Sequence, residues 1–454
     1  MNSTAQRPLG MGRPRAFVLL LLLSAALPAS AQGMKEAKLP DSPLGKLAAS
    51  YLQAFNSGRR DALRDFIAAN YSDSALRDRS ADSRAALQAS FYRSLGSLAV
   101  YRVEHPSDDE LRLLVRARLT GEWMRLGFSA AEGKPLRVPG IVFEPTLCPS
   151  RAACPARLSD AQVVAELSSY LEALSAADAF AGVVLLARDG SPLLEKAYGT
   201  SPWQAPNLPS SRFALASIGK MFVGVAVAQL AEQGRLSFHD PIRKFLPEQP
   251  RQITGRVTVQ HLLTHTSGLA SFLDSEGYAE VQHLSPQDSL PVFFRRGLSF
   301  EPGERWQYSN AGYITLEAIV ERVSGQTFSA YLEQHIFQPA GMRETSSGYT
   351  TARDLLRFSS ALRENKLLNR ENTAGLLRPR IQTTWGEARY GYGFAVLEAR
   401  GQRIVGHAGA SPGWNGQLDV YWGTSGYTVV VLANREVPVA QRVAVRIRDL
   451  LSRR

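Results

Sequence analysis

A serine and a lysine stand three residues apart at Ser217 and Lys220, within the stretch FALASIGKMFV. Residues with this spacing are neighbours on one side of a helix, so the lysine amine can take the proton of the serine hydroxyl. The stretch from Met221 to Ala228 is almost wholly apolar, which is typical of a helix buried on every side. Burial penalises a charged lysine and lowers its pKa, which supplies the neutral amine that a base requires. Ser-x-x-Lys alone also arises by chance on polar helices, so other motifs must support it.

Two further short motifs supply side chains that acyl transfer needs. The stretch PGERWQYSN places Tyr308 and Asn310 two residues apart after a Pro-Gly turn, and GHAG places His407 at the expected end of a strand. We expect Tyr308, as a phenolate or as a relay, to move the proton from Ser217 to the leaving group. Asn310 can hold the lysine and a substrate amide, and His407 can donate to the far side of the acyl group. Each also has a structural interpretation, as a core tyrosine, a turn residue and a strand-end histidine.

Together these motifs resemble the class C β-lactamase and penicillin-binding-protein-like serine hydrolases, also described as the peptidase S12 family. The resemblance rests on SIGK, YSN and HAG in this order, with HLLTHTSGL and the hairpin AGVVLLARDG as flanking sequence. It implies that Ser217 is the nucleophile, that Lys220 and Tyr308 form its proton network, and that no metal or organic cofactor is used. It also implies an oxyanion hole made by the backbone N–H groups of Ser217 and Ala410, the residue after Gly409.

The third motif departs from the family pattern. Many lactamases of the family resemble Lys-Thr-Gly there, whereas this chain has His407, Ala408 and Gly409. The cation that would grip a β-lactam carboxylate is weakened and the hydroxyl is absent. This favours an esterase, amidase or peptidase acting on a small-molecule or peptide-like substrate. A β-lactamase or D-alanyl-D-alanine carboxypeptidase, and a non-catalytic binder of cell-wall fragments or of a partner protein, remain alternatives. His265 lies in a family motif, where we expect it to serve helix-end structure.

A second serine motif overlaps the third one. Residues 409–413 read G-A-S-P-G and match the G-x-S-x-G nucleophile elbow of α/β-hydrolases. In that elbow the residue after the serine donates an N–H to the oxyanion, and Pro412 has none. We therefore interpret Ser411 as part of a flexible wall rather than a nucleophile, with Trp414 and Asn415 as candidate substrate contacts.

The elements that must position these residues occupy residues 159–454. Ser159 and Gln162 resemble a capping box that opens a helix to about Leu174. Predicted strands at 181–187 and 193–198 form a hairpin, further strands follow at 403–405, 418–422 and 427–432, and a helix closes the chain at 440–451. The strands from both ends would form one antiparallel sheet, with the mainly helical stretch 240–369 inserted on one side. The fold class is α+β, of the β-lactamase and transpeptidase type.

A smaller α+β domain is predicted for residues 42–146. Helices at 44–55, 62–69 and 85–95 precede strands at 98–103, 111–119, 123–128 and 136–143. This order resembles the NTF2-like cone fold, which implies an accessory role in binding a ligand, a partner or the second domain. His105 stands alone and the acidic residues 108–110 indicate a solvated turn, so we expect no catalysis here.

The N-terminus and the stretch between the domains indicate the compartment. Residues 1–31 combine three arginines, an apolar run and the small residues Ala29-Ser30-Ala31, which is typical of a secretory signal peptide, although an uncleaved anchor is the alternative. Residues 147–158 form the predicted linker, and its Cys148 and Cys154 can form a local disulfide in an oxidising compartment or stay free thiols. We expect a periplasmic or secreted protein without stable membrane insertion after cleavage.

The charge balance narrows the class of partner. The chain has a formal net charge of +11, but no cluster of five or more Lys and Arg residues is seen. Charges alternate in sign along most segments, so the sequence does not favour nucleic-acid binding. The oligomeric state is not determined by the sequence.

Overall fold

The computed structural model describes residues 36–131, 136–150, 153–154, 157–269, 281, 283–423, 425–435 and 438–453. The chain from Glu36 onward forms one compact unit. The predicted signal peptide, residues 1–31, lies outside the described residues. Within those ranges, no helix has both the length and the apolar character that a membrane crossing requires.

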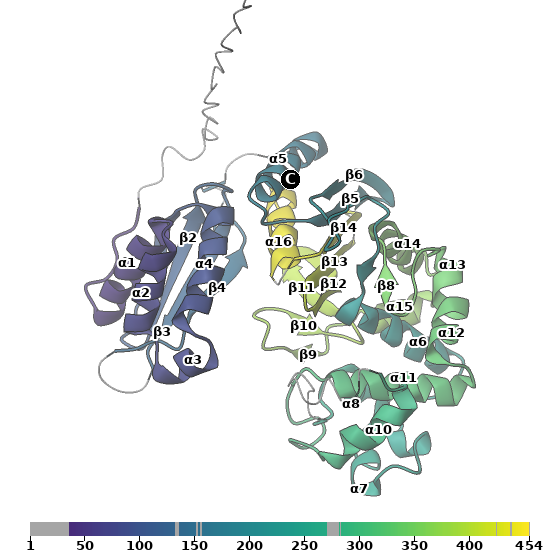
Figure 1. Ribbon diagram of the computed structural model, residues 1–454. Coiled ribbons are helices and arrows are strands. Elements are labelled where there is room, and N and C mark those ends of the chain that lie inside the picture. The colour runs from purple at the N-terminus through teal and green to yellow at the C-terminus, as the bar shows by residue number, and fades with distance from the viewer. Residues whose placement is uncertain are drawn as a thin grey trace, which may run out of the picture. The chain divides into compact units, whose positions relative to one another are not determined.

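Four helices and a four-stranded antiparallel sheet form the N-terminal part of the fold, drawn in purple and blue in Figure 1. The strands follow in chain order across the sheet, and Tyr51, Phe55 and Phe128 lie in the core between helices and sheet. The elements are α1 (Pro43–Asn56), α2 (Arg60–Asn70), α3 (Asp73–Asp78), α4 (Ala81–Leu95), β1 (Leu98–Glu104), β2 (Glu110–Ala117), β3 (Trp123–Ser129) and β4 (Ile141–Thr146).

The predicted helices and first three strands of this part are confirmed to within a few residues, while α3 was not predicted. The fourth strand was predicted at 136–143 and lies at Ile141–Thr146. Pro139 and Gly140 interrupt the apolar run, so Val138 pairs with Tyr71 in an isolated bridge and the strand begins only after the glycine. The NTF2-like resemblance and the domain boundaries remain predictions.

An eight-stranded antiparallel sheet organises the rest of the chain, in the order β6-β5-β14-β13-β12-β11-β10-β9. The pairing of β5 with β14 confirms that strands from both ends of this region share one sheet. The strands are β5 (Gly182–Arg188), β6 (Ser191–Tyr198), β9 (Ile381–Gln382), β10 (Arg389–Tyr390), β11 (Ala395–Ala399), β12 (Gln402–Ser411), β13 (Trp414–Trp422) and β14 (Tyr427–Ala433). The strands β9 to β11 were not predicted, because two of them have only two residues each.

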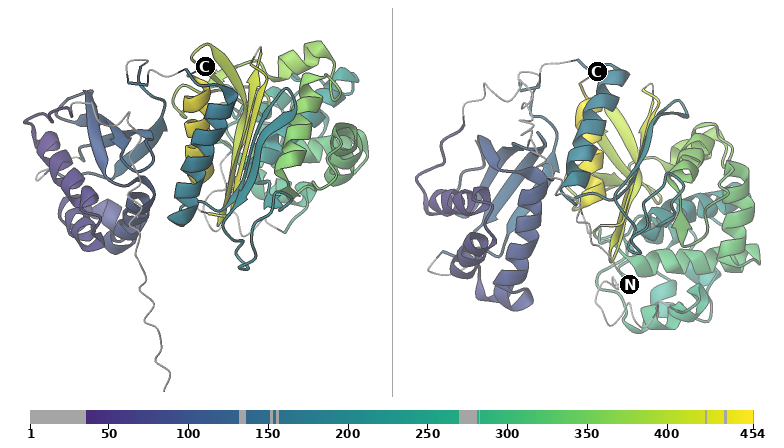
Figure 2. Two further views of the ribbon diagram at one scale, coloured as in Figure 1. Left: turned by 90° about the horizontal axis from the view of Figure 1, so that it is seen from above. Right: turned by 45° about the horizontal axis from the view of Figure 1, so that its top comes forward.

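Strand β5, which lies between β6 and β14, shows how this sheet is buried on both faces. Its side chains alternate between two cores, with Val183 and Leu185 in one and Val184 and Leu186 in the other. One face is covered by α5 (Asp160–Ala176) and α16 (Val439–Leu451), as Figure 2 shows. The predicted capping box of Ser159 is confirmed at the start of α5.

The other face carries the helices that hold the site (Figures 1 and 2). The predicted helical insertion at 240–369 is confirmed, and the described residues of this stretch contain one strand, of two residues. The elements on this side are β7 (Phe213–Ala214), η2 (Ala216–Gly219), α6 (Lys220–Glu232), η3 (Ile242–Lys244), α7 (Arg251–Thr254), α8 (Val259–Leu263), α10 (Pro286–Arg295), α11 (Asn310–Ser324), α12 (Phe328–Leu332), η4 (Glu333–Phe337), α13 (Gln338–Ala340), β8 (Tyr349–Thr350), α14 (Ala352–Arg363) and α15 (Arg370–Leu376).

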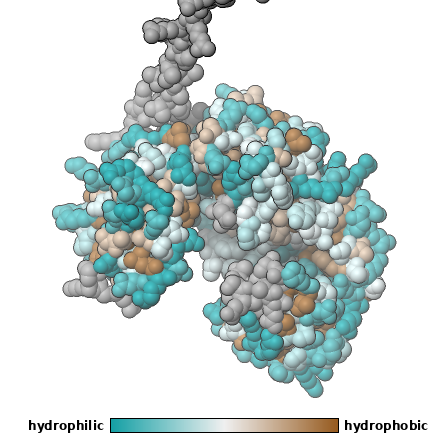
Figure 3. Space-filling model, viewed as in Figure 1, coloured by the Kyte–Doolittle hydropathy of each residue, from teal (hydrophilic) through white to brown (hydrophobic). Residues whose placement is uncertain are grey.

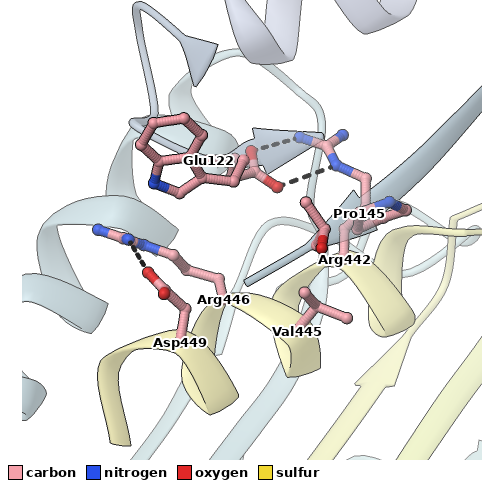
Figure 4. Close-up of a pocket in the computed structure, with 8 residues that line it drawn as sticks. Glu122, Pro145, Arg442, Val445, Arg446 and Asp449 are labelled. Carbon is pink, nitrogen blue, oxygen red and sulfur yellow. Dashed lines mark hydrogen bonds and ion pairs between the residues drawn. The ribbon is translucent and has the colours of Figure 1, made fainter. Parts of the chain in front are cut away.

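A buried ion pair ties β3 to α16 (Figure 4). Arg442 donates to both carboxylate oxygens of Glu122, which also accepts from Thr120, and the two charged side chains are only 4% and 5% exposed. Arg442 donates in addition to the hydroxyl of Ser94. Burial raises the pKa of Glu122, but the charge of Arg442 and the hydrogen bonds to the carboxylate together outweigh burial, and the pKa is lowered.

The segment between the two sheets is anchored to the second one. Cys148 and Cys154 form a disulfide, which confirms the first of the two predicted alternatives, a local disulfide or free thiols. The backbone N–H of Cys148 donates to the buried carboxylate of Asp449 in α16. On the face drawn in Figure 3, the described residues are mostly hydrophilic and the apolar ones are scattered among them.

Candidate active site

Ser217 lies on a 3₁₀ turn, η2, and not on the α-helix that we expected to hold both residues; α6 begins at Lys220. Residues three apart on a 3₁₀ turn eclipse one another, so the pair still shares one side. Ala216, just before the serine, has a backbone φ of 44°, in the left-handed region. That conformation is costly for a residue with a Cβ, and it turns the chain so that Ser217 stays partly exposed at the start of a buried helix.

Lys220 connects the first two motifs. Its Nζ lies 3.2 Å from Ser217 Oγ and donates to Asn310 Oδ1 at 2.8 Å. The side chain is 8% exposed, and burial lowers the pKa of Lys220 to about 8, with the charge of Glu317 opposing that shift. A substantial fraction of the amine is therefore neutral near pH 8 and can accept a proton from the serine.

The second motif is held at the N-terminus of α11. Ser309 caps this helix by accepting from Gly312 N, which places Tyr308 just before the helix and Asn310 as its first residue. The N–H of Ser309 donates to Nδ1 of the buried His265, whose ring lies 4.4 Å from that of Tyr308. His265 thus does more than end helix α8, because it fixes the backbone and ring of the second motif.

Burial keeps the phenol of Tyr308 protonated. It raises the pKa of Tyr308 well above 10, although a hydrogen bond with Ser217 opposes that rise. Lys220 Nζ lies 4.9 Å from the centre of the same ring. Of the two roles that we expected for Tyr308, the neutral relay therefore fits the site better than the phenolate.

His407 reaches the site but has no N–H to offer. Its Nδ1 faces the carbonyl oxygen of Ala408, which only accepts, so the proton is on Nδ1 and Nε2 accepts from Tyr390 Oη at 2.9 Å. Burial, with the charge of Lys220, lowers the pKa of His407 to about 3, so the ring is neutral. The donation to substrate that we expected from His407 is therefore absent in this arrangement. The histidine also lies within β12, which runs on to Ser411, and not at a strand end.

Gly409 brings β12 against the serine turn. A Cβ at this glycine would lie 2.7 Å from Leu215 O and 3.2 Å from Ile218 N, so no larger residue fits without moving the turn. The contact sets β12, the strand that contains both Gly409 and Ala410, against the turn that carries Ser217. This is the arrangement that two oxyanion N–H groups on different elements require.

The overlapping G-x-S-x-G motif is a hairpin and not the flexible wall that we expected. Ser411 ends β12 and Trp414 begins β13. Asn415 is 4% exposed, donates to the carbonyl of Arg435 and accepts from Ala440 N. It therefore holds β13 to the start of α16 and is not a substrate contact. Trp414 packs on Phe213, with ring centres 5.7 Å apart.

Several residues at the site were missed by sequence reasoning. Glu317 lies two helical turns after Asn310 on α11, so helical periodicity from the YSN motif was a signal for it. Burial raises the pKa of Glu317, and the charge of Lys220 opposes that rise. Trp306 lies two residues before Tyr308 within the second motif, so its place in the sequence was a signal for it. Trp385 and Tyr390 carry no local signal, because only the sheet and its loops bring them to Tyr308 and His407.

Comparison with known proteins finds relatives that match the part of the chain carrying the three motifs. The family model described as Beta-lactamase matches residues 167–349 and 346–452, which include all three motifs. Penicillin-binding protein 4* of Bacillus subtilis (strain 168) is 29% identical over 332 residues, covering 60% of this chain and 71% of that protein. Esterase EstB of Burkholderia gladioli is 36% identical over 179 residues, covering 36% of this chain and 45% of that protein.

Solved structures extend the likeness to the fold. A penicillin-binding protein from Bacillus halodurans superposes with a TM-score of 0.55 and 28% identity, covering 65% of this chain and 100% of that structure. A D-amino acid amidase from Ochrobactrum anthropi SV3 shares the fold with a TM-score of 0.55 at 19% identity, over 63% of this chain and 98% of that structure. With more than half of its length matched by the family model, and with the motif side chains gathered at one place, the chain belongs to the Beta-lactamase family.

Proposed function

We propose that this chain is an exported serine hydrolase that cleaves an ester or amide through an acyl-enzyme on Ser217. The observation that carries the proposal is the contact of Lys220 Nζ with both Ser217 Oγ, at 3.2 Å, and Asn310 Oδ1, at 2.8 Å. A buried amine with a lowered pKa beside a partly exposed hydroxyl is the arrangement that activates a serine.

In acylation, Ser217 Oγ bonds to the substrate carbonyl carbon while its proton passes to neutral Lys220. The N–H groups of Ser217 and Ala410 stabilise the oxyanion. As the bond to the leaving group breaks, that group takes the proton of Tyr308 Oη, and Lys220 returns a proton to the phenol. Asn310 holds the amine through its oxygen, which leaves its amide NH₂ group for the substrate.

In deacylation the same groups act in reverse on a water molecule. Water bonds to the acyl carbon and gives its proton to neutral Lys220, directly or through the Tyr308 hydroxyl, which passes its own proton to Lys220 as it accepts that of water. The ester bond to Ser217 then breaks as the serine oxygen takes this proton back from Lys220. Every transferred proton stays within these side chains, the substrate and water, so the cycle needs no metal or organic cofactor.

The third motif supports a substrate ester or amide that has no carboxylate in the part that lies against His407. His407 is neutral and both its ring nitrogens have partners, so it supplies neither charge nor a hydrogen bond to an anion. EstB is described as an esterase and the Ochrobactrum protein as a D-amino acid amidase, which are the two reaction classes that we propose. Export rests on the leader composition and on the Cys148–Cys154 disulfide.

Intact mass spectrometry tests the nucleophile. The mature protein is exposed briefly to an activated short-chain ester and, separately, to a penicillin, beside a Ser217→Ala variant and a matched Ser411→Ala variant. We expect an acyl adduct with the ester that disappears in Ser217→Ala and persists in Ser411→Ala. An adduct retained in Ser217→Ala refutes the assignment of the nucleophile.

The same experiment separates the alternatives. A faster adduct with the penicillin than with the ester favours a β-lactamase or carboxypeptidase. No adduct and no turnover with either compound favours the non-catalytic binder, which keeps the fold to recognise cell-wall fragments or a partner.

A further inference from the structure

Trp385 is a large apolar side chain that the fold holds in an exposed position at the site. It is 44% exposed and lies in the loop between β9 and β10. The hydroxyl of Thr383 accepts from Trp385 N at 3.0 Å and donates to Ala388 O at 2.7 Å, and Gln382 Nε2 donates to Gly386 O at 2.9 Å. Side-chain hydrogen bonds therefore preorganise the loop before any substrate arrives.

The indole of Trp385 stands beside both the second and the third motif. Its ring centre lies 5.3 Å from that of Tyr308 and 6.3 Å from that of His407. Trp306 supports it from another side, edge-on at 5.0 Å. The indole N–H of Trp306 is buried and has no partner within the described residues. The exposed tryptophan is thus the outer member of an aromatic cluster around the proton relay.

The proposed chemistry decides which part of the substrate meets this ring. The leaving group receives its proton from Tyr308 Oη, so it must come within hydrogen-bond distance of that phenol. A group in that place lies next to the indole. An indole favours aromatic and apolar partners, and the neutral His407 beside it offers no charge to a carboxylate.

We propose that Trp385 is a specificity-determining residue that packs against the leaving group, and that the substrates are esters or amides whose leaving group is uncharged and aromatic. This inference rests on the proposed function, because it uses Tyr308 as the donor to the leaving group. It adds the substrate class to that function.

Three acetate esters test the inference, because they share one acyl-enzyme and differ only in the alcohol. We compare kcat/KM for benzyl, ethyl and 4-carboxybenzyl acetate in the wild type, Trp385→Ala and Trp385→Phe, with Ser217→Ala as the blank. We expect the wild type to prefer benzyl acetate by at least about tenfold over the other two, on the scale of one aromatic contact. Trp385→Ala should lose that preference while ethyl acetate changes by less than about threefold, and Trp385→Phe should keep most of it.

Trp203→Ala is the matched control. Trp203 is 79% exposed and its ring contacts Trp414 rather than Tyr308, so this variant should keep the wild-type order of the three esters. An equal loss on all three esters in Trp385→Ala overturns the inference, because it assigns the ring only to support of Tyr308. An unchanged preference in that variant overturns it as well. Failure of the proposed function looks different: the wild type and Ser217→Ala would then hydrolyse every ester at the same background rate.

Discussion

At the scale of single residues, the chemistry of the site depends on which side chains are protonated at neutral pH. Burial moves three neighbouring groups in the direction of their neutral forms: it lowers the pKa of Lys220 and of His407 and raises that of Tyr308. Of these three groups, only Lys220 has a pKa close to neutral pH, at about 8. These directions support our proposal that the amine is the general base and that the phenol carries a proton for the leaving group, while the neutral imidazole accepts from Tyr390.

The pH dependence of kcat/KM tests the role of Lys220. The neutral amine is the active form, so the rate with an uncharged ester should rise as pH rises and level off above a midpoint of about 8. Below that midpoint each pH unit should cost about tenfold, because the neutral fraction of a single base falls by that factor. A flat profile from pH 6 to 9, or a midpoint near the ordinary lysine value, would contradict this assignment.

An Asn310→Asp variant moves the same midpoint in a known direction. Asn310 Oδ1 accepts from Lys220 at 2.8 Å, so the aspartate would place a negative charge beside the ammonium group. That charge favours the protonated lysine and should raise the midpoint by about one to three pH units. The matched Asn310→Ala variant removes the hydrogen bond without adding charge and separates this effect from loss of positioning.

At the scale of elements, the site is made where β12 touches the turn η2. The two elements come from distant parts of the chain and meet because Gly409 has no side chain. The same principle joins α6 to the segment before β11, where a Cβ at Gly224 would lie 2.3 Å from Tyr392 O. Close backbone contact at these two glycines therefore holds η2 against β12, and α6 against the segment before β11.

Gly409→Ala tests this contact. A methyl group 2.7 Å from Leu215 O must push β12 away from η2, and would thereby separate the N–H groups of Ser217 and Ala410 that we propose as the oxyanion hole. We expect kcat/KM to fall by about a hundredfold and the free energy of unfolding to fall by about 1–3 kcal/mol. Gly375→Ala is the matched control, because that glycine lies in α15 with no atom within 4 Å of an added Cβ. Similar effects of the two substitutions would refute the close-contact argument.

At the scale of the whole molecule, the two sheets are joined by a buried charge pair. Glu122 lies immediately before β3, and Arg442 lies in α16. Both side chains are almost completely buried, and two hydrogen bonds join them. A buried pair of this kind adds little stability compared with apolar residues, but removing one partner leaves an uncompensated charge. The pair therefore sets where β3 and α16 meet, and it lies apart from the catalytic motifs.

Arg442→Met tests the cost of breaking the pair. We expect the free energy of unfolding in urea to fall by about 3–5 kcal/mol, while kcat/KM of the folded protein stays near that of the wild type. The double variant Glu122→Gln with Arg442→Met should recover part of that loss. Arg60→Ala is the surface control, because Arg60 and Asp82 form an ion pair that is 55% and 63% exposed, and its loss should cost less than about 1 kcal/mol. Equal costs for the two single variants would contradict this account.

The sequence by itself determined the features that depend on near neighbours. The spacing of Ser217 and Lys220, the capping box of α5 and the continuous apolar run of β5 each involve residues close together in the sequence, so local patterns were enough. The family motifs also identified Tyr308 and Asn310. Only the tertiary structure decided the use of His407, the role of His265 and the presence of Trp385 beside Tyr308. Those contacts join residues from separate elements. The register of the sheet and the length of its loops bring these residues together, and no local sequence pattern encodes either of them.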